Sequence, residues 1–298
     1  MKIKGLAQEE LITGSLSCAG CSSILAVRLA LKVLGSHTVV IAPAGCMSTV
    51  NCYWPQIPFR VPFFVSPFAA TGAILQGVSA GFSYRNRKDV HVIAIAGDGG
   101  TADIGMSSFS QAITSGYKFI YICVDNQAYM NTGNQWSSTT PPGAVTTTTP
   151  IPETIQENTG KDLFKIALAH NIPYAATASP AYPSDYAEKV RKAASVDGPS
   201  FIHVLTPCPP GWGFSTERTI EIGCLAVECG MWYLCEYQAG QIRFTHQPKE
   251  RKPISEYLAT QSRFCRMKPK DIACLQKIVD ERMEELEANA RTPARKKL

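Results

Sequence analysis

The chain has 298 residues, of which 45% are hydrophobic and 18% charged, and its formal net charge is +5. This composition is typical of a globular protein with a large core. The sequence has no basic array with interleaved aromatic residues, which argues against nucleic-acid binding. No apolar run reaches membrane-spanning length and the first residues do not resemble a signal peptide. We therefore expect a cytoplasmic protein that does not enter a membrane.

Eleven cysteines are spread along the chain. Without a secretory signal a disulfide framework is not expected. Thiols in a reducing compartment fill the core, bind metals or react with other groups. The positions of the cysteines therefore matter more than their number.

Three of the cysteines lie at turns between predicted elements. Cys18 and Cys21 precede an amphipathic helix expected at 23–34, which ends at a glycine. Cys46 follows a buried strand expected at 38–42. The pattern fits a zinc site, a redox dithiol or an iron–sulfur cluster. Taken alone, it favours zinc over a cluster and a cluster over isolated core thiols.

Two strand–turn units follow a predicted irregular loop at 53–67 and a small-residue helix at 68–82. The run VHVIAIA at 90–96 predicts a buried strand that ends in the turn GDGGT at 97–101. A helix is expected at 102–115, and a second buried strand at 119–124 ends in Asp125 and Asn126. Ligands bind beyond the carboxyl ends of parallel strands. Both turns are therefore expected at one ligand-binding edge.

The residues of these turns suit a phosphate and a metal ion. Gly97, Gly99 and Gly100 allow close approach of the backbone and leave amide N–H groups free to bind an anion. The threonine at 101 is a predicted helix N-cap. Asp98 and Asn126 offer the oxygen ligands that Mg²⁺ prefers. GDGG alone fits a simple glycine turn equally well, and the second unit favours a ligand site.

The sequences GDGGTADIG at 97–105 and YICVDNQAYMNTGNQWSSTTPPGA at 121–144 resemble the thiamine diphosphate motif of 2-oxoacid:ferredoxin oxidoreductase β subunits. The resemblance extends from about Leu16 to Phe264. It implies an α/β fold with a doubly wound, mostly parallel sheet and a helical C-terminal extension. We divide the chain into a thiamine diphosphate-binding domain with the cluster cysteines at 1–215 and an extension at 216–298, which packs on it and on partner subunits.

The resemblance also implies roles for individual residues. Asp98, Asn126 and the carbonyl of Ala128 would hold Mg²⁺, and Asn131 would be catalytic, near the reacting carbon. The implied cofactor-binding residues are Cys46, Gly97, Asp98, Gly99, Gly100, Thr101, Asn126, Ala128, Asn131 and Thr132.

In the family a [4Fe–4S] cluster beside the thiamine is held by four cysteines, which reverses the preference for zinc. Cys18, Cys21 and Cys46 match the first three ligands. We choose Cys208 as the fourth, because it follows a strand predicted at 201–205 and so lies at the cofactor edge. Cys224, in a more helical context, is the alternative.

The implied activity is oxidative decarboxylation of a small 2-oxoacid, with pyruvate and coenzyme A as the first choice. Electrons would pass through the cluster to ferredoxin. A partner α subunit would supply the glutamate that protonates the thiamine pyrimidine, and γ- and δ-type subunits would complete the enzyme. Alternatives are a related enzyme for oxalate or another 2-oxoacid without coenzyme A, a zinc-stabilised phosphate-binding module, or a thiamine-dependent carboligase without a cluster.

Two residues depart from the family pattern near the site. Ser22 follows the second cysteine, where the family usually has Gly or Ala, and Trp136 stands where it usually has Arg. Loss of an arginine removes a possible carboxylate or phosphate partner. The choice of pyruvate and the use of coenzyme A are therefore open.

The second half of the chain predicts fewer chemical groups. The Thr- and Pro-rich stretch at 137–159 lies across the cofactor in the family, and we expect an ordered lid there. Helices are expected at 161–170, 184–194, 219–237 and 271–290, with a short strand at 241–245. His203 falls inside a strand, where a structural role is the simplest interpretation.

Overall fold

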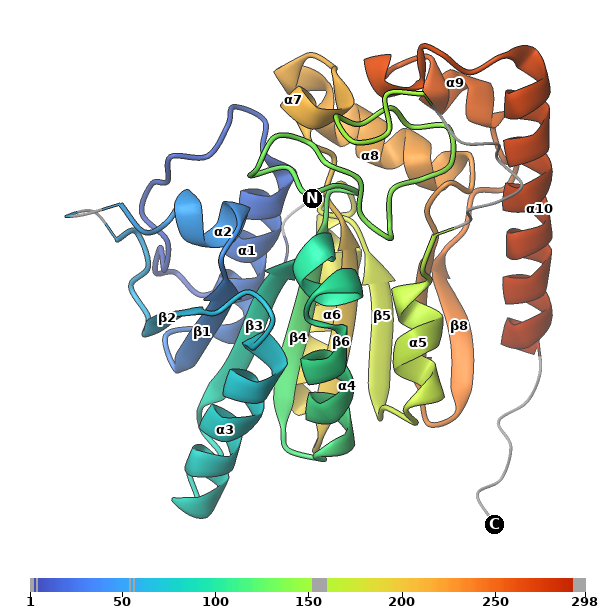
Figure 1. Cartoon of the computed structure of the whole chain (residues 1–298). Coiled ribbons are helices and arrows are strands. Elements are labelled where there is room, and N and C mark those ends of the chain that lie inside the picture. The colour runs from blue at the N-terminus through green and yellow to red at the C-terminus, as the bar shows by residue number, and fades with distance from the viewer. Residues whose placement is uncertain (1–2, 4, 54, 56, 152–159, 292–298) are drawn as a thin grey trace.

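An eight-stranded sheet runs through the centre of the molecule in the order β2-β1-β3-β4-β6-β5-β7-β8 (Figure 1). The computed structural model describes residues 3, 5–53, 55, 57–151 and 160–291. Six strands run parallel: β1 (Thr38–Pro43), β2 (Phe63–Ser66), β3 (His91–Gly97), β4 (Phe119–Asp125), β5 (Tyr174–Ala178) and β6 (Pro199–Leu205). The hairpin of β7 (Leu234–Gln238) and β8 (Gln241–His246) adds antiparallel to β5. The predicted fold class is confirmed.

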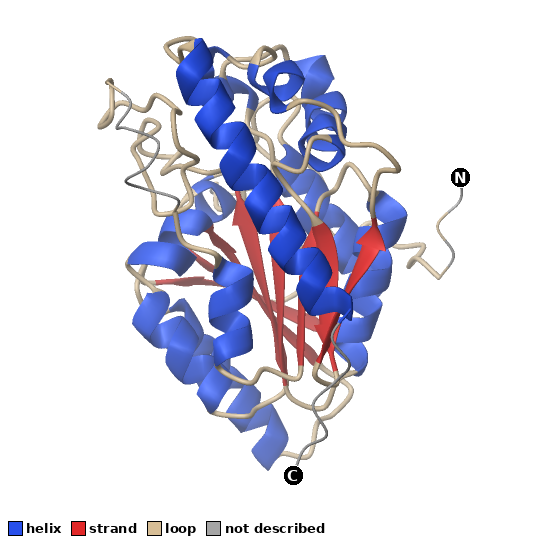
Figure 2. Ribbon diagram, turned by 90° about the vertical axis from the view of Figure 1, so that its right-hand side faces the viewer, coloured by secondary structure: helices blue, strands red, loops and turns tan. Residues whose placement is uncertain are grey.

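Helices cover both faces of the sheet (Figure 2). On one face α1 (Ser22–Leu34) packs beside α6 (Pro183–Ser195). The other face carries α3 (Thr71–Tyr84), α4 (Met106–Thr114), α5 (Leu163–Ala169), α8 (Thr219–Glu228) and the long α10 (Pro269–Arg291). Shorter turns of helix are α2 (Cys46–Thr49), η1 (Gly99–Asp103), α7 (Pro209–Trp212), η2 (Thr216–Arg218), α9 (Ile254–Leu258) and η3 (Ser262–Phe264). None of the helices in the described ranges is long and apolar enough to cross a bilayer.

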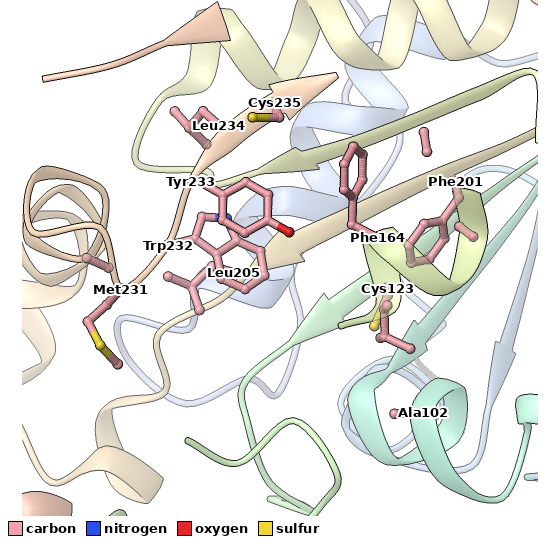
Figure 3. Close-up of a cluster of buried hydrophobic side chains, with 14 of the residues drawn as sticks. Ala102, Cys123, Phe164, Phe201, Leu205, Met231, Trp232, Tyr233, Leu234 and Cys235 are labelled. Atoms are coloured by element: carbon pink, nitrogen blue, oxygen red, sulfur yellow. The ribbon is translucent and has the colours of Figure 1, made fainter. Parts of the chain in front are cut away.

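Two hydrophobic cores follow from the alternation of side chains along the strands. In β3, Ala94 and Ala96 pack into the core under α3 and α4, and Ile93 and Ile95 pack into the core under α1 and α6. Because successive strand residues point to opposite faces, a strand apolar throughout is buried on both. Figure 3 shows part of the first core, where the ring of Phe164 meets that of Tyr233 edge-on with centroids 6.1 Å apart.

The order in which the chain adds strands to the sheet switches sides between the parallel strands β1 and β3. These strands are neighbours, yet β1 leads outward to β2 and β3 leads to β4 on the other side. The loops after β1 and β3 therefore diverge and leave a crevice at the carboxyl edge, which is where ligands bind in such sheets. Asp98 directly follows β3, and Cys46 begins α2 after the two-residue turn that follows β1.

The structure differs from three of the expected elements and contains one strand that was not expected. Residues 63–66 of the expected irregular loop form the edge strand β2, which pairs with β1. The helix expected at 102–115 begins as the π-helical turn η1, and α4 follows. The helix expected at 219–237 ends at Glu228, because Gly230 has a φ of +79° and the chain then turns into β7. A strand at 174–178, β5, was not predicted.

The sheet continues across the expected domain boundary at residue 215. β7 pairs with β5, and α8 and α10 contribute side chains to the core of the preceding strands. The boundary stays a prediction. The C-terminal segment completes the sheet and covers one of its faces.

Candidate active site

A cavity of about 200 Å³ opens in the crevice at the carboxyl ends of β1, β3 and β4. Its walls include all of the predicted cofactor-binding residues except Thr101: Cys46, Gly97, Asp98, Gly99, Gly100, Asn126, Ala128, Asn131 and Thr132. Apolar side chains, among them Phe68, Ile95 and Met130, line the rest. These residues thus line one cavity, and their roles toward a cofactor stay predictions.

The side-chain amide of Asn126 ends beside two oxygen acceptors of residues that line this cavity. The side-chain oxygen of Asn126 lies 2.8 Å from the carbonyl oxygen of Ala128 and 3.2 Å from Oδ1 of Asp98. Three acceptors facing one another without a proton between them repel each other. Either the amide of Asn126 turns over and donates to both neighbours, or a cation sits among the three oxygens.

The carboxylate of Asp98 is buried and crowded by a second carboxylate. Its side chain is 1% exposed, and burial together with the nearby charge of Asp125 raises the pKa of Asp98 well above its usual value. The hydroxyl of Ser137 donates to Oδ2 at 2.5 Å, and the hydroxyl of Thr139 lies 3.2 Å from the same oxygen; both partly offset this rise. A cation bound at Oδ1 would stabilise the charged form further.

Thr101 lies outside the cavity, and the prediction that it caps a helix is wrong. It sits inside η1, fully buried. Its hydroxyl donates to the carbonyl of Gly97 at 2.8 Å and lies 3.2 Å from the hydroxyl of Tyr121. The side chain therefore ties the π-helical turn to β3 and β4.

Asp125 and His203 form a buried pair behind the cavity that sequence analysis did not connect. Nε2 of His203 lies 2.7 Å from Oδ2 of Asp125, while Oδ1 accepts from Thr139 and from the amide of Gln127. Strand register provides the signal, because His203 of β6 stands opposite Cys123, two residues before Asp125. His203 thus has a structural role, as expected, and it acts on the turn that carries Asn126.

Arg263 and Trp212 brace the same turn from the C-terminal segment. The indole N–H of Trp212 donates to the carbonyl of Asn126 at 2.7 Å, and the guanidinium of Arg263 lies 3.7 Å from the centre of the Trp212 ring. Arg263 also donates to Oε1 of Gln127, which has a φ of +63°. These contacts hold a non-glycine residue in a left-handed conformation next to Asn126.

The four predicted cluster cysteines lie at the same edge of the sheet. Burial and the neighbouring Cys21 and Cys18 raise the pKa of the Cys46 thiol to about 11. Burial raises the pKa of Cys208 to about 12, with contributions from Cys21, Cys46 and Cys18. Thiols that raise one another's pKa in this way lie close to one another. A bound cation would lower these pKa values, because it stabilises the thiolate form.

Cys224 has a different environment. Its thiol is half-buried and its pKa is raised by burial and by Glu228, while Tyr182 donates a hydrogen bond to it. Among the residues with described positions, no three His, Cys, Asp or Glu side chains converge on one point as a single metal ion would require. The ligands of a cubane cluster bind four separate iron atoms and are spaced more widely.

The loop after β4 runs over the carboxyl edge of the sheet (Figure 1). Asn131 and Thr132 are exposed and line the cavity, whereas Trp136 does not. The loop is anchored at Val145, whose amide donates to the carbonyl of Arg263 at 2.8 Å. Of the expected lid, residues 137–151 lie at this edge, and residues 152–159 fall outside the described residues.

Comparison with known proteins agrees with this geometry. Residues 43–204 match the family model of the C-terminal TPP-binding domain of thiamine pyrophosphate enzymes. The chain is 46% identical over 284 residues to pyruvate synthase subunit PorB of Methanothermobacter thermautotrophicus, which covers 94% of this chain and 98% of the relative. It is 42% identical over 288 residues to ketoisovalerate oxidoreductase subunit VorB of Pyrococcus horikoshii, with 94% and 93% covered.

A solved structure shares the fold. The 2-oxoglutarate:ferredoxin oxidoreductase of Magnetococcus marinus superimposes with a TM-score of 0.57 at 19% identity, over 75% of this chain and 84% of that chain. The matches to the two relatives extend along nearly the whole sequence, and the match to the thiamine pyrophosphate domain includes β3, β4 and the turns that line the cavity. The chain therefore belongs to the β subunits of the 2-oxoacid:ferredoxin oxidoreductases, a family of oxidoreductases that use thiamine pyrophosphate.

Proposed function

We propose that this subunit holds thiamine diphosphate through Mg²⁺ in the cavity described above and serves the oxidative decarboxylation of pyruvate with coenzyme A. The observation that carries the proposal is that the side-chain amide of Asn126 ends beside the carbonyl of Ala128 and Oδ1 of Asp98, so that three groups able to offer an oxygen to a cation meet in the cavity. Two ligands at right angles around Mg²⁺, with bonds of 2.0–2.1 Å, lie about 2.9 Å apart. The separations of 2.8 and 3.2 Å are close to this value.

The remaining walls fit the rest of the cofactor. Thiamine diphosphate, when bound, stabilises the carbanion that decarboxylation of a 2-oxoacid leaves behind. The side of Gly97 that would carry a Cβ faces open space, which leaves the backbone accessible to a diphosphate. Phe68 and Met130 give part of the wall an apolar surface, and Asn131, which is exposed and lines the cavity, would orient the substrate as the catalytic residue.

A [4Fe–4S] cluster on Cys18, Cys21, Cys46 and Cys208 would collect the electrons. Cys18, Cys21 and Cys46 raise the pKa of Cys208, whereas burial and Glu228 raise the pKa of Cys224. This difference supports Cys208 rather than Cys224 as the fourth ligand. Cys46 lines the cofactor cavity itself. The cluster would thus lie beside the reacting centre, where electrons pass over a short distance.

The partners follow from the family and from the shape of the site. An α subunit would close the open side of the cavity and supply the pyrimidine-side glutamate, γ- and δ-type subunits would carry electrons onward, and ferredoxin would accept them. The relatives are named for pyruvate and for ketoisovalerate. Pyruvate is the first choice, and ketoisovalerate and oxalate are the competing substrates. A cytoplasmic location stays a prediction.

The test is an anaerobic assay of the enzyme purified with its partner subunits. Reduction of ferredoxin is measured with pyruvate, ketoisovalerate and oxalate, each with and without coenzyme A. We expect the highest kcat/KM with pyruvate and a requirement for coenzyme A. Preference for another acid would overturn the substrate, and a lack of reduction with all three would overturn the reaction.

A further inference from the structure

The loop that follows β4 reaches back to the buried carboxylate of Asp98. Ser137 is fully buried and its hydroxyl donates to Oδ2 of Asp98 at 2.5 Å. Thr139 lies 3.2 Å from the same oxygen through its own hydroxyl. Oδ1 of Asp98 is the oxygen that faces Asn126. Oδ2 of Asp98 thus contacts the loop, and Oδ1 of the same carboxylate faces Asn126.

A count of protons shows that Ser137 is the principal donor. The hydroxyl of Thr139 has one proton and lies closer to Oδ1 of Asp125, at 2.9 Å, than to Asp98. The hydroxyl of Thr140 uses its proton on the carbonyl of Gln127 at 2.8 Å and accepts from the amide of Ser137. The single proton of Ser137 is therefore left for Asp98.

The same short segment spans two strand ends. Ser137 contacts Asp98, which follows β3, and Thr140 contacts Gln127, which follows β4. The carboxylate of Asp98 and the amide of Asn126 belong to these two turns. Because the loop bonds to both turns, it fixes the distance between the side chains of Asp98 and Asn126 before a ligand binds. This preorganisation lowers the free-energy cost of ordering the site on binding.

We infer that Ser137 is a positioning residue for metal and cofactor binding, which holds Asp98 with Oδ1 turned toward Asn126 and Ala128. The inference rests on the proposed function of the cavity. Ser137 touches neither substrate nor cofactor in this role. Partners that orient a metal ligand typically change metal affinity by about 10–100-fold when removed.

The experiment compares four forms of the full chain: the natural sequence, Ser137→Ala, Thr139→Val and Ser138→Ala. Ser138 is the matched control, because it is a buried serine of the same loop whose hydroxyl does not contact Asp98. Binding of Mn²⁺ in the presence of thiamine diphosphate is followed by electron paramagnetic resonance, for the chain alone and with its co-purified partner subunits. Thermal unfolding without ligand monitors the fold.

We expect Ser137→Ala to weaken cofactor-dependent Mn²⁺ binding by about 10–100-fold, with full stoichiometry restored at high Mn²⁺. Its unfolding transition should stay cooperative, at a lower temperature than that of the natural chain because a buried hydrogen bond is lost. Thr139→Val should weaken binding less, and Ser138→Ala should match the natural chain. Equal affinity of Ser137→Ala and Ser138→Ala would overturn the inference. If Ser137→Ala fails to fold, Ser137→Cys, which keeps a side chain of similar shape but only a weak S–H donor toward Asp98, is measured instead and judged by the same comparison with Ser138→Ala. Absence of cofactor-dependent binding by the natural chain would overturn the proposed function itself.

Discussion

Gly97 and Gly99 lie two residues apart in the same turn and have different physical reasons for being glycine. A Cβ at Gly97 would meet no atom within 4 Å and would project into open space. A Cβ at Gly99 would lie 2.4 Å from the ring of Tyr129. One glycine therefore leaves room for a ligand, and the other leaves room for a neighbouring side chain.

This difference predicts opposite phenotypes for two alanine substitutions. Gly99→Ala should lower the free energy of unfolding by about 1–3 kcal/mol, because the ring of Tyr129 must shift. Gly97→Ala should leave stability unchanged but weaken thiamine diphosphate binding by about tenfold or more, because its methyl group enters the cavity. Urea unfolding and cofactor titration measure the two effects. A destabilised Gly97→Ala with normal cofactor affinity would contradict this assignment.

The cysteine pair near the N-terminus is tied to the cysteine after β6 by serine hydroxyl groups. Ser22, the first residue of α1, donates to the carbonyl of Pro207 at 2.7 Å, and Ser23 donates to the hydroxyl of Thr206 at 3.0 Å. Gly20 packs so closely that a Cβ would lie 2.3 Å from the carbonyl oxygen of Thr216. The departure of this chain at Ser22 thus adds a hydrogen bond between two cysteine-bearing segments.

Ser22→Ala should loosen this connection. We expect a loss of about 1 kcal/mol in stability and several-fold faster release of iron to a chelator under anaerobic conditions. Ser17→Ala is the control, because its hydroxyl bonds only to Ser15 within the described N-terminal segment. Release of iron from Ser22→Ala at the natural rate would show that the hydrogen bond does not hold the two segments together.

Glu236 of β7 joins four elements on the side of the sheet away from the cavity. Its carboxylate is buried, and it accepts from Lys192 of α6 at 3.0 Å, from Arg243 of β8 and from the hydroxyl of Tyr174 of β5. Burial alone would raise the pKa of Glu236, but the bonds from Lys192 and Arg243 lower it overall. A depressed carboxyl pKa contributes stability above the unfolded value of about 4.3.

Glu236→Gln should therefore destabilise the protein at neutral pH by about 1–3 kcal/mol. The difference from the natural chain should shrink as the pH falls below the unfolded pKa and through the lower folded pKa, where Glu236 itself is protonated. Urea unfolding across this pH range measures it. Glu221→Gln is the control, since Glu221 pairs with Arg218 on the surface and should have little effect. A difference that stays constant with pH would argue against the ion pairs as its source.

At the scale of the whole molecule, buried parallel strands and their turns were the parts that the sequence predicted best. Runs such as 92–96 are apolar throughout and glycine, Asp and Asn residues follow them directly, so the fold and part of the lining of the cavity could be derived from the residues. The resemblance to a known family added Ala128, Asn131 and Thr132. Local pattern failed where tertiary contacts decide the conformation. β7 was taken for helix because Gly230 and the pairing with β5 are not visible in periodicity.

The supporting residues of the site were hidden for a similar reason. In the sequence, Ser137 lies 39 residues from Asp98, His203 lies 78 residues from Asp125, and Arg263 lies 136 residues from Gln127. Their roles depend on strand register and on the return of the C-terminal segment. Sequence reasoning found groups that line the cavity, such as Asp98 and Asn126, because they lie directly after strands, and it missed the groups that hold them.

The proposed thiamine site and the four proposed cluster cysteines lie at one edge of the sheet. The most direct test of the proposed function is the metal content of the full chain. Iron, sulfide and zinc are measured anaerobically with a visible spectrum, for the natural chain, Cys208→Ser and Cys224→Ser. We predict about four iron and four sulfide per natural chain, kept in Cys224→Ser and lost from Cys208→Ser. A colourless chain with stoichiometric zinc, or a cluster that survives in Cys208→Ser, would contradict it.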